Sequence, residues 1–376
     1  MIYRNYGKTG KQVSLLGFGG MRFGHIDDHD ECVRMMVKAA EGGVTYFDTA
    51  PAYFGIKSET VYGKGLAELR RRKLPYYLAT KTFESTEKDI RTELEAQLKR
   101  LDVPAIDFYH IWCITNLDNW QTRKKNGVLD TFRKLKEEGL IRHICVSSHL
   151  IQEEIEEFLM EGLFEGVLFG YSAYNFKTRE RAFNTIRSNQ LGAVVMNPLG
   201  GGIVPQHPEL FGFLQDKGNT PKPGTPQAAS AAVEAGLHFL WDHRDISATL
   251  VGFGSEAEVA AALAAMEHYK PRTEAELAAV KDRASSSFEG ICTGCAYCDD
   301  CPQGIPIPRY MDAYNQKLLS EPSKGDYNLY DRLSGYWTIK PEGAADCIAC
   351  GQCESACTQH INIIERLKYI AENKAG

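Results

Sequence analysis

The chain has 376 residues, enough for one large barrel-sized domain and a smaller second one. Hydrophobic residues make up 43% and charged residues 24%, which is typical of a folded globular protein rather than a disordered one. The formal net charge of −6 gives no basic excess and argues against nucleic acid as a partner. The first residues lack the apolar core of a signal peptide, and no apolar run approaches the roughly 20 residues of a membrane span. We therefore expect a cytoplasmic protein without a membrane segment.

Short apolar runs alternate with amphipathic helical stretches along residues 1–275. The expected strands are Ser14–Gly17, Val44–Asp48, Tyr76–Lys81, Ile106–Trp112, His143–Ser147, Gly166–Tyr171, Ala193–Asn197 and Ala248–Gly252. The expected helices are Glu31–Glu41, Ile90–Leu101, Leu129–Glu138, Glu153–Met160, Thr178–Ser188 and Ala228–Asp242. Eight strands alternating with helices predict an α/β fold, a closed (β/α)8 TIM barrel. A doubly wound sheet is the alternative, but Gly17–Gly20 lacks the spacing of its dinucleotide fingerprint.

The cysteines are unevenly distributed, because eight of the eleven lie between Cys292 and Cys357. In a cytosolic chain, clustered cysteines bind metal more often than they form disulfides. A polar stretch, Arg272–Ser287, leads into this region. We expect the barrel over residues 1–275 and a metal-binding domain over residues 276–376. Two cysteine units in it are each followed by a helical stretch, Arg309–Leu319 and Ile363–Asn373, which predicts a pseudo-twofold domain with two equivalent centres.

The cysteine spacing indicates the kind of metal centre. The two motifs are Cys292, Cys295, Cys298 and Cys301, and then Cys347, Cys350, Cys353 and Cys357. Repeated runs of four cysteines favour iron–sulfur clusters over zinc, whose sites use paired cysteines. The motifs resemble those of bacterial two-cluster ferredoxins, in which the fourth cysteine of each motif ligates the other cluster. The resemblance implies one [4Fe–4S] cluster on Cys292, Cys295, Cys298 and Cys357, and another on Cys347, Cys350, Cys353 and Cys301.

The chain departs from the ferredoxin pattern at two places. The first motif is one residue short before its fourth cysteine, and the second has Thr358 where proline is usual. Neither departure removes a ligand. The fold expected for residues 276–376 is therefore a C-terminal ferredoxin-like domain with two [4Fe–4S] clusters, which are either redox-active or purely structural.

Three polar residues stand near the ends of consecutive barrel strands. Asp48 ends one strand, Tyr53 follows in the next loop, and Lys81 ends the next strand. In a barrel this is the face that carries chemistry. Here the chain resembles the aldo-keto reductase family, which the segments Tyr3–Gly10, Leu16–Met21, Pro198–Gly202 and Leu250–Gly252 also match. Together with the cysteine domain, it looks like the iron–sulfur branch of that family.

The resemblance implies hydride transfer between a nicotinamide and a carbonyl carbon, with Tyr53 protonating the oxygen. Tyrosine ordinarily ionises near pH ~10, and a neighbouring Lys81 ammonium favours the phenolate. Asp48 would hold Lys81 in place. Where the family usually has a histidine, this sequence has Trp112, which can donate a hydrogen bond but cannot transfer a proton. His110, two residues earlier, is either a displaced fourth member or an interior histidine, and His149 is another polar candidate at the same mouth.

The nucleotide site implied by the resemblance departs from the family pattern. Its residues would be Gly20, Met21, Ser147, Tyr171, Pro198, Leu199, Gly200, Gly252 and Ser255. Tyr171 or Tyr174 would stack on the nicotinamide, and phosphates would meet the helix after Gly252. The family's Glu-Asn pair is replaced by Ala261 and Ala262, and no Lys or Arg in residues 252–258 would bind a 2′-phosphate. This favours NADH over NADPH, and a vestigial site stays open.

We expect an oxidoreductase that acts on a carbonyl or alcohol and exchanges electrons through two [4Fe–4S] clusters. Clusters carry one electron and a hydride carries two, so such coupling needs another group, for instance a flavin, for which no site is identified. The alternatives are an NAD(P)H carbonyl reductase with a structural tail, an electron-transfer protein with a scaffold barrel, and a non-redox lyase or isomerase using Tyr53 and Lys81. The expected partners are a small-molecule substrate and a ferredoxin or other electron carrier, and an oligomer is compatible with the sequence.

Overall fold

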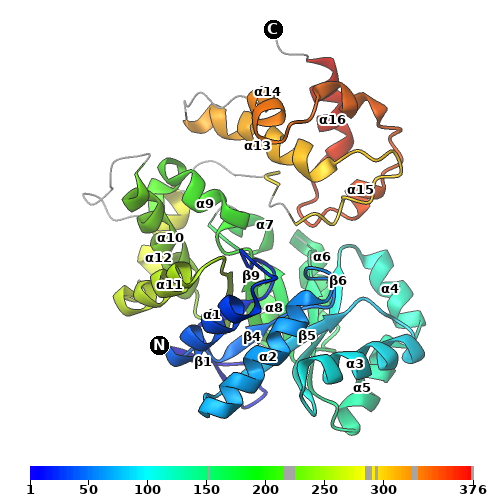
Figure 1. Ribbon diagram of the computed structural model, residues 1–376, viewed down its shortest axis with the longest axis vertical. Coiled ribbons are helices and arrows are strands. Elements are labelled where there is room, and N and C mark those ends of the chain that lie inside the picture. The colour runs from blue at the N-terminus through cyan, green and yellow to red at the C-terminus, as the bar shows by residue number, and fades with distance from the viewer. Residues whose placement is uncertain are drawn as a thin grey trace. The chain divides into compact units, whose positions relative to one another are not determined.

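A computed structural model describes residues 1–150, 152–173, 175–214, 225–283, 290–292, 295–323 and 329–373. The chain forms two compact units. The first consists of Met1–Ser172, Thr178–Pro198 and Leu237–Leu277. The second consists of Ala173–Lys177, Leu199–Gly236 and Ala278–Gly376. Figure 1 shows the strands of the first unit in blue to green and the C-terminal helices of the second in orange and red.

The first unit contains a closed parallel barrel, which confirms the predicted fold class. Its strands are hydrogen-bonded in the order β10-β3-β4-β5-β6-β7-β8-β9. They are β3 (Leu16–Gly19), β4 (Tyr46–Asp48), β5 (Tyr77–Thr82), β6 (Ile106–Ile114), β7 (Ile141–Ser148), β8 (Gly166–Gly170), β9 (Gly192–Met196) and β10 (Ala248–Gly252). Because all eight strands run in the same direction, their C-terminal ends meet at one face, where barrel enzymes carry their chemistry.

A small hairpin precedes the barrel and corrects the first predicted strand. Strands β1 (Tyr3–Asn5) and β2 (Gln12–Ser14) pair antiparallel, so Ser14 belongs to the hairpin and the barrel strand begins at Leu16. The reason is Tyr6, whose buried ring stacks on Phe108 inside the barrel with centroids 4.1 Å apart. A Cβ at Gly166 or at Gly192 would lie 2.2 Å from the Tyr6 side chain, so both strands need glycine there.

Helices lie between the strands along the chain. They are α1 (His29–Glu41), α2 (Lys57–Arg72), α3 (Glu87–Leu101), α4 (Leu117–Lys125), α5 (Val128–Glu137), α6 (Gln152–Met160), α7 (Phe176–Arg179), α8 (Ala182–Asn189), α10 (Pro226–Trp241), α11 (Glu256–His268) and α12 (Glu274–Arg283). The single predicted helix Thr178–Ser188 is divided into α7 and α8. Helix α12 occupies most of the polar stretch Arg272–Ser287, whose residues 284–287 lie outside the described part.

The second unit contains the cysteine region and the helices around it. Its remaining elements are η1 (Gly200–Gly202), α9 (Ile203–Gln206), η2 (Pro208–Leu214), α13 (Ile307–Ser323), α14 (Leu329–Asp331), η3 (Arg332–Tyr336), η4 (Pro341–Asp346), α15 (Gln352–Ser355) and α16 (Ile363–Glu372). The two helices predicted after the cysteine motifs are present as α13 and α16. Their apolar faces share one buried core, which includes Met311, Leu367 and Ile370.

The pseudo-twofold repeat is visible in the backbone hydrogen bonds. The amide of Gly304 donates to Cys301, and in the same way the amide of His360 donates to Cys357. Ile307 then donates to Ile305, and Ile363 to Ile361, both at 2.8 Å. Gly304 and His360 both have positive φ, at 68° and 51°. One turn therefore follows the fourth cysteine of each motif and starts each helix.

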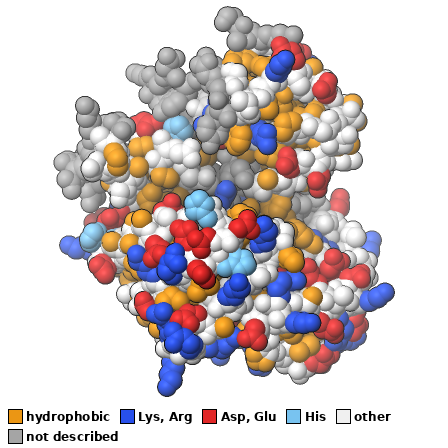
Figure 2. Space-filling view, viewed as in Figure 1, with side chains coloured by type: hydrophobic (Ala, Val, Ile, Leu, Met, Phe, Trp, Pro, Cys, Tyr) orange, Lys and Arg blue, Asp and Glu red, His pale blue; other side chains and the backbone are white. Residues whose placement is uncertain are grey.

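The surface carries charges of both signs. Figure 2 shows Lys and Arg side chains interspersed with Asp and Glu side chains over the visible face. Among the residues that the structure describes, no helix is both long and apolar enough to cross a membrane.

Candidate functional site

Asp48, Tyr53 and Lys81 lie together at the C-terminal end of β4 and β5. The Nζ atom of Lys81 is 2.6 Å from each carboxylate oxygen of Asp48. These two side chains are only 1% and 3% exposed. The same Nζ lies 5.6 Å from the centroid of the Tyr53 ring, which is half-buried. The structure thus brings the three predicted catalytic residues into one cluster.

Burial and pairing act in opposite directions on this cluster. Burial lowers the pKa of Lys81, and the attraction of Asp48 partly offsets that shift. Burial likewise raises the pKa of Asp48, and Lys81 opposes it. Each charge in such a buried pair depends on the other, because removing one partner leaves the other uncompensated in a poorly solvated interior. Asp48 therefore holds the Lys81 ammonium beside the phenol ring.

A second network, which sequence reasoning missed, fixes the backbone around Lys81. The buried carboxylate of Glu59 in α2 accepts hydrogen bonds from Thr80 at 2.8 Å, from Gln97 at 3.0 Å and from Arg100 at 2.6 and 2.9 Å. Gln97 also donates to the carbonyl of Lys81 at 2.9 Å. Glu59 stands beside Ser58 at the start of a helix, where an acidic residue is ordinarily explained by the helix dipole. Its role as an anchor is visible only in the fold.

Trp112 is aimed at the same cluster by a β-bulge. The register between β6 and β7 shifts between Ile111 and Ile114, and Cys113 has a positive φ of 61°. Arg123 donates to the freed Trp112 carbonyl at 2.7 Å. Bulges commonly re-aim a side chain beside an active site.

The indole of Trp112 forms part of an aromatic group at the mouth of the barrel. Its ring stacks on Phe83, with centroids 3.8 Å apart, and meets Tyr53 edge-on, with centroids 5.7 Å apart. Phe83 is 40% exposed, whereas Trp112 is buried. Trp112 therefore contacts the predicted catalytic tyrosine directly.

His110 lies deeper in the barrel and is a neutral side chain. It is paired with Lys81 across β5 and β6, and its Nδ1 lies 3.3 Å from the Thr80 carbonyl. Its Nε2 atom is buried and has no hydrogen-bond partner among the described residues. Burial, together with repulsion from Lys81, lowers the pKa of His110 to about 3. His149 is also buried, just after β7, and its amide donates to Ile114.

The predicted nucleotide-binding residues lie after the barrel strands. Gly20 follows β3, donates to Asp48 at 2.8 Å and has no room for a Cβ, which would lie 2.5 Å from Ser58 Oγ. Ser147 lies near the end of β7, and its buried Oγ has no partner among the described atoms. A buried hydroxyl in this condition fits the carboxamide of a nicotinamide. Met21 follows Gly20, and Pro198, Leu199 and Gly200 follow β9.

The predicted phosphate site at the start of α11 is partly filled by the chain itself. Ser255 caps α11 and accepts from the amide of Glu258 at 3.3 Å. The amide of Gly254 donates to the Glu258 carboxylate at 2.8 Å. Gly252, at the end of β10, is covered by Arg22, because a Cβ there would lie 2.6 Å from that side chain. A carboxylate thus occupies a backbone donor that a phosphate would need.

Tyr171 is not open to a ligand in this structure. Its side chain is fully buried, its hydroxyl donates to Glu180 at 3.0 Å, and its ring packs against Phe183 and Phe239. The other candidate for stacking on the nicotinamide, Tyr174, lies outside the described residues. The stacking role stays a prediction for both.

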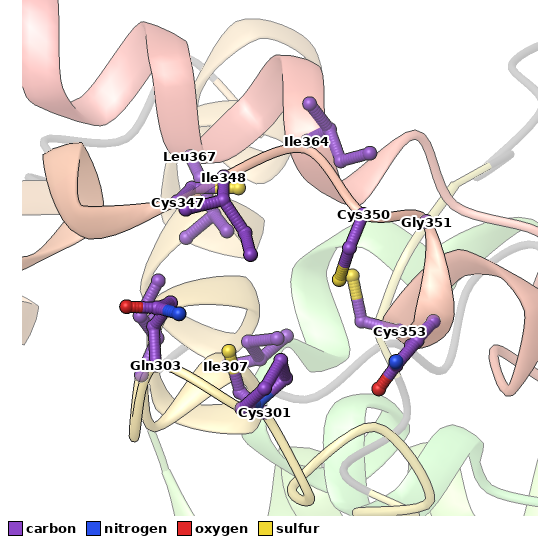
Figure 3. Close-up of a pocket in the computed structure, with 13 residues that line it drawn as sticks. Cys301, Gln303, Ile307, Cys347, Ile348, Cys350, Gly351, Cys353, Ile364 and Leu367 are labelled. Atoms are coloured by element: carbon purple, nitrogen blue, oxygen red, sulfur yellow. The ribbon is translucent and has the colours of Figure 1, made fainter.

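The cysteines of the second unit form two groups. Cys301 lines one hollow together with Cys347, Cys350 and Cys353. Figure 3 shows that Cys301 comes to this hollow from a different segment than the other three. Ile305, Ile307, Ile364 and Leu367 supply apolar walls. The grouping matches the crossed ligand set that the ferredoxin resemblance implies.

The remaining four cysteines lie in the other group. Burial raises the pKa of the Cys298 thiol, and the neighbouring Cys295, Cys292 and Cys357 add to this shift, as expected for one group of four. Cys295 Sγ is 3.3 Å from Thr358 Oγ1, next to Cys357. Among the described residues, no three Cys, His, Asp or Glu side chains converge as a single metal ion would require. Four cysteines around a hollow fit a four-iron cluster, whose thiolate ligands stand apart at its corners.

The fold and these two regions define a class of protein: a TIM-barrel oxidoreductase joined to a domain for iron–sulfur clusters. Residues 15–281 match the model of the aldo/keto reductase family, and residues 291–362 match that of the 4Fe-4S dicluster domain. The chain belongs to the aldo/keto reductase family.

Individual relatives agree with this assignment. The chain is 26% identical to "L-galactose dehydrogenase" of Arabidopsis thaliana over 310 residues, covering 77% of this chain and 93% of that protein. It is 29% identical to "Uncharacterized oxidoreductase YrpG" of Bacillus subtilis over 229 residues, covering 54% of this chain and 68% of that one. In fold it resembles the holo form of aldo-keto reductase AKR11C1 from Bacillus halodurans, with a TM-score of 0.61 and 24% identity, covering 75% and 96% of the two chains.

Proposed function

We propose that this protein interconverts a carbonyl and an alcohol at the mouth of the barrel, with NADH as the nucleotide. We propose further that its two [4Fe–4S] clusters exchange single electrons with this site through an additional redox group, such as a flavin, that divides the two electrons of the hydride. The observation that carries the proposal is the buried Asp48–Lys81 pair beside Tyr53. Since clusters require reduced thiols, we place the protein in the cytoplasm.

Tyr53 is the proton donor in this proposal. Its ring is half-buried at the mouth, so its hydroxyl can reach both a substrate and solvent. The Lys81 ammonium favours the phenolate that remains after Tyr53 gives its proton to the substrate oxygen. Asp48 prevents Lys81 from moving away, and Glu59 with Gln97 fixes the strand that carries it. These residues raise the rate by keeping a proton donor and its stabilising charge in position.

Trp112 takes the place of the family's histidine as an orienting group. Its indole N–H is a donor and cannot accept a proton. His110 stays neutral at physiological pH, because its pKa is about 3, and it therefore supplies no proton there. Tyr53 is thus the acid of this site, while Trp112 and Phe83 contact the substrate.

The nicotinamide end fits this site better than the phosphate end does. When bound, the nucleotide supplies or accepts the hydride. Ser147 offers an unused buried hydroxyl for the carboxamide. At the other end, Glu258 occupies the Gly254 amide and would have to move when phosphate binds. A carboxylate here also repels a 2′-phosphate, which supports NADH over NADPH.

The aromatic mouth supports a substrate class. The exposed face of Phe83, backed by Trp112, offers a flat apolar platform of the kind that binds the C–H face of a sugar or polyol. One relative bears the name L-galactose dehydrogenase, which agrees with a hydroxylated substrate. We propose a sugar-like hydroxy carbonyl or its alcohol, with a ferredoxin or another one-electron carrier as the partner of the clusters.

The test is an anaerobic titration of purified protein with NADH and then NADPH, while the visible cluster absorption is followed with and without sugar lactones and aldoses. Bleaching with NADH would support electron transfer from the nucleotide to the clusters. A response confined to nucleotide binding would leave a carbonyl reductase with a structural tail. Tyr53→Phe should abolish turnover, whereas Tyr76→Phe, whose hydroxyl accepts a hydrogen bond from Arg70, should not. Turnover that survives Tyr53→Phe would contradict the proposal.

A further inference from the structure

The two groups of cysteines differ in the charges beside them. Arg366, in α16, donates from Nη1 to the carbonyl of Gly290 at 2.6 Å. Gly290 lies two residues before Cys292, the first cysteine of the first motif. The guanidinium carbon of Arg366 lies 4.8 Å from the centroid of the Tyr314 ring. A positive charge is therefore held against the segment that begins the first cysteine group.

This arrangement is rigidly supported. Asn315, which is 3% exposed, exchanges two hydrogen bonds with the backbone of Cys292, at 2.9 and 2.8 Å. Gly290 has a positive φ of 79°, and a Cβ there would lie 2.4 Å from Arg366 Nη2. The arginine can approach this closely only because the residue is glycine. Burial lowers the pKa of Arg366, and the neighbouring Tyr314, Cys292, Cys357 and Glu365 act in the opposite direction.

The second group of cysteines has a different environment. The residues that line its hollow, among those described, are apolar or uncharged besides the four cysteines. The charged neighbours on the chain are Asp346, directly before Cys347, and Glu354, directly after Cys353, whose carboxylate accepts from the amide of Ile364 at 2.9 Å. Acidic residues therefore flank both motifs, since the exposed Asp299 and Asp300 follow Cys298. What distinguishes the first group is the partly buried Arg366 that is held against it.

We propose that Arg366 raises the reduction potential of the first centre (Cys292, Cys295, Cys298 and Cys357) above that of the second, so that the first electron to enter the domain stays there. Each reduction adds one negative charge to a cluster, and a nearby fixed positive charge stabilises the reduced form. The second centre has the more exposed loop, since Cys350 is exposed, and water favours reduction there too. The charge of the partly buried Arg366 is screened only weakly by solvent, so its effect on the first centre is the larger one. At the second centre, the negative charge of Glu354 opposes the stabilisation of the reduced cluster by water.

The inference rests on the proposed assignment of the eight cysteines, and the experiment separates the two. The full-length protein is titrated anaerobically with dithionite, which supplies one electron to each centre, and the reduced clusters are followed by electron paramagnetic resonance. Arg366→Gln and Arg366→Leu should lower the midpoint of one centre by roughly tenfold in its reduction equilibrium, about 59 mV for one electron, and leave the other unchanged. Arg366→Lys retains the positive charge and should therefore keep the midpoint potential close to that of the wild type.

Lys368→Leu is the matched control. Lys368 lies two residues further along α16, carries the same charge, and is 71% exposed beside Glu372. Neither centre should move in that variant. Equal shifts of both centres, or no shift in Arg366→Gln with the full complement of iron and sulfide, would overturn the inference and leave the cluster assignment standing. Wild-type protein that holds no clusters after anaerobic reconstitution would overturn both.

Discussion

Replacing Lys81 by methionine should destabilise the barrel by about 3–5 kcal/mol at pH 7, because it leaves the Asp48 carboxylate buried without a partner. The structure supports the upper part of this range. Both side chains are at most 3% exposed, and Nζ contacts both oxygens at 2.6 Å. Methionine has a similar volume, so the cost comes from the lost charge rather than from a cavity. Urea unfolding followed by tryptophan fluorescence measures this cost.

The pH dependence of the variant has a definite sign. Burial already raises the pKa of Asp48, and Lys81 is the partner that opposes this shift. Without Lys81 the folded-state pKa rises further above the unfolded value, so protonation favours the folded state. The cost of Lys81→Met should therefore shrink as the pH falls from 7 towards the pKa of Asp48 in the unfolded chain, near ~4.

A double-mutant cycle decides whether the pair acts as one unit. Lys81→Met combined with Asp48→Leu replaces both charges with apolar groups, which is often nearly neutral for buried pairs. We expect the double variant to lose less free energy of unfolding than the sum of the two single losses, with a coupling energy of about 2–3 kcal/mol. A cost of Lys81→Met below about 1 kcal/mol, or additive effects, would refute this account of the site.

Three further predictions follow from the same geometry. Glu258→Ala should tighten NADH binding by about tenfold, since it frees the Gly254 amide. The control is Glu256→Ala, which should change binding less because the Glu256 carboxylate pairs with Arg34 at 2.9 Å. Calorimetry would measure both affinities, and equal effects would argue against a phosphate site at this position. His110→Leu should make the free energy of unfolding less dependent on pH. The pKa of His110 is about 3 in the folded chain and ~6.5 ordinarily, so the protein is fully stable above pH 6.5 and loses stability as the pH falls towards 3. Between pH 7 and 5 this loss is about 2 kcal/mol, and it should disappear in the variant. Urea midpoints at both pH values would show it, and an unchanged difference would contradict the assigned pKa. Cys301→Ser should remove the second centre and leave the first, as judged by iron content and paramagnetic resonance; loss of the first centre instead would contradict the crossed ligand sets.

The cysteine region shows how much a local pattern can predict. The spacing of the eight cysteines follows from the shape of the cluster that they hold, and a short loop with a cysteine at every third position is nearly determined by its sequence. The two helices after the motifs were likewise predictable, since each begins after the same turn. The position of Arg366 beside the first centre was not predictable, because Arg366 and Gly290 are far apart along the chain.

Most of the barrel was predictable for a similar reason, because most of its strands and helices have a local hydrophobic periodicity. The start of the first strand was predicted two residues too early. The hairpin places the Tyr6 side chain against Gly166 in β8 and Gly192 in β9, which are distant in sequence. Helices α2 and α4 were missed. Helix α2 buries Ser58, Glu59, Gly63 and Gly65 beside its apolar residues. The buried face of α4 rests on Trp120 and Arg123 rather than on an apolar stripe.

The sequence by itself determined the strand order of the barrel, the identity of the catalytic candidates and the number of cluster ligands, because these depend on local periodicity and on residue spacing. Only the tertiary structure decided how these candidates are placed and what they contact. It showed that Lys81 is buried against Asp48 and that Trp112 is turned towards Tyr53 by a bulge. It also showed that Glu258 accepts a hydrogen bond from the Gly254 amide at the predicted phosphate site. Such properties depend on burial and on contacts between distant segments, and charges and hydrogen bonds change strength when folding removes them from water.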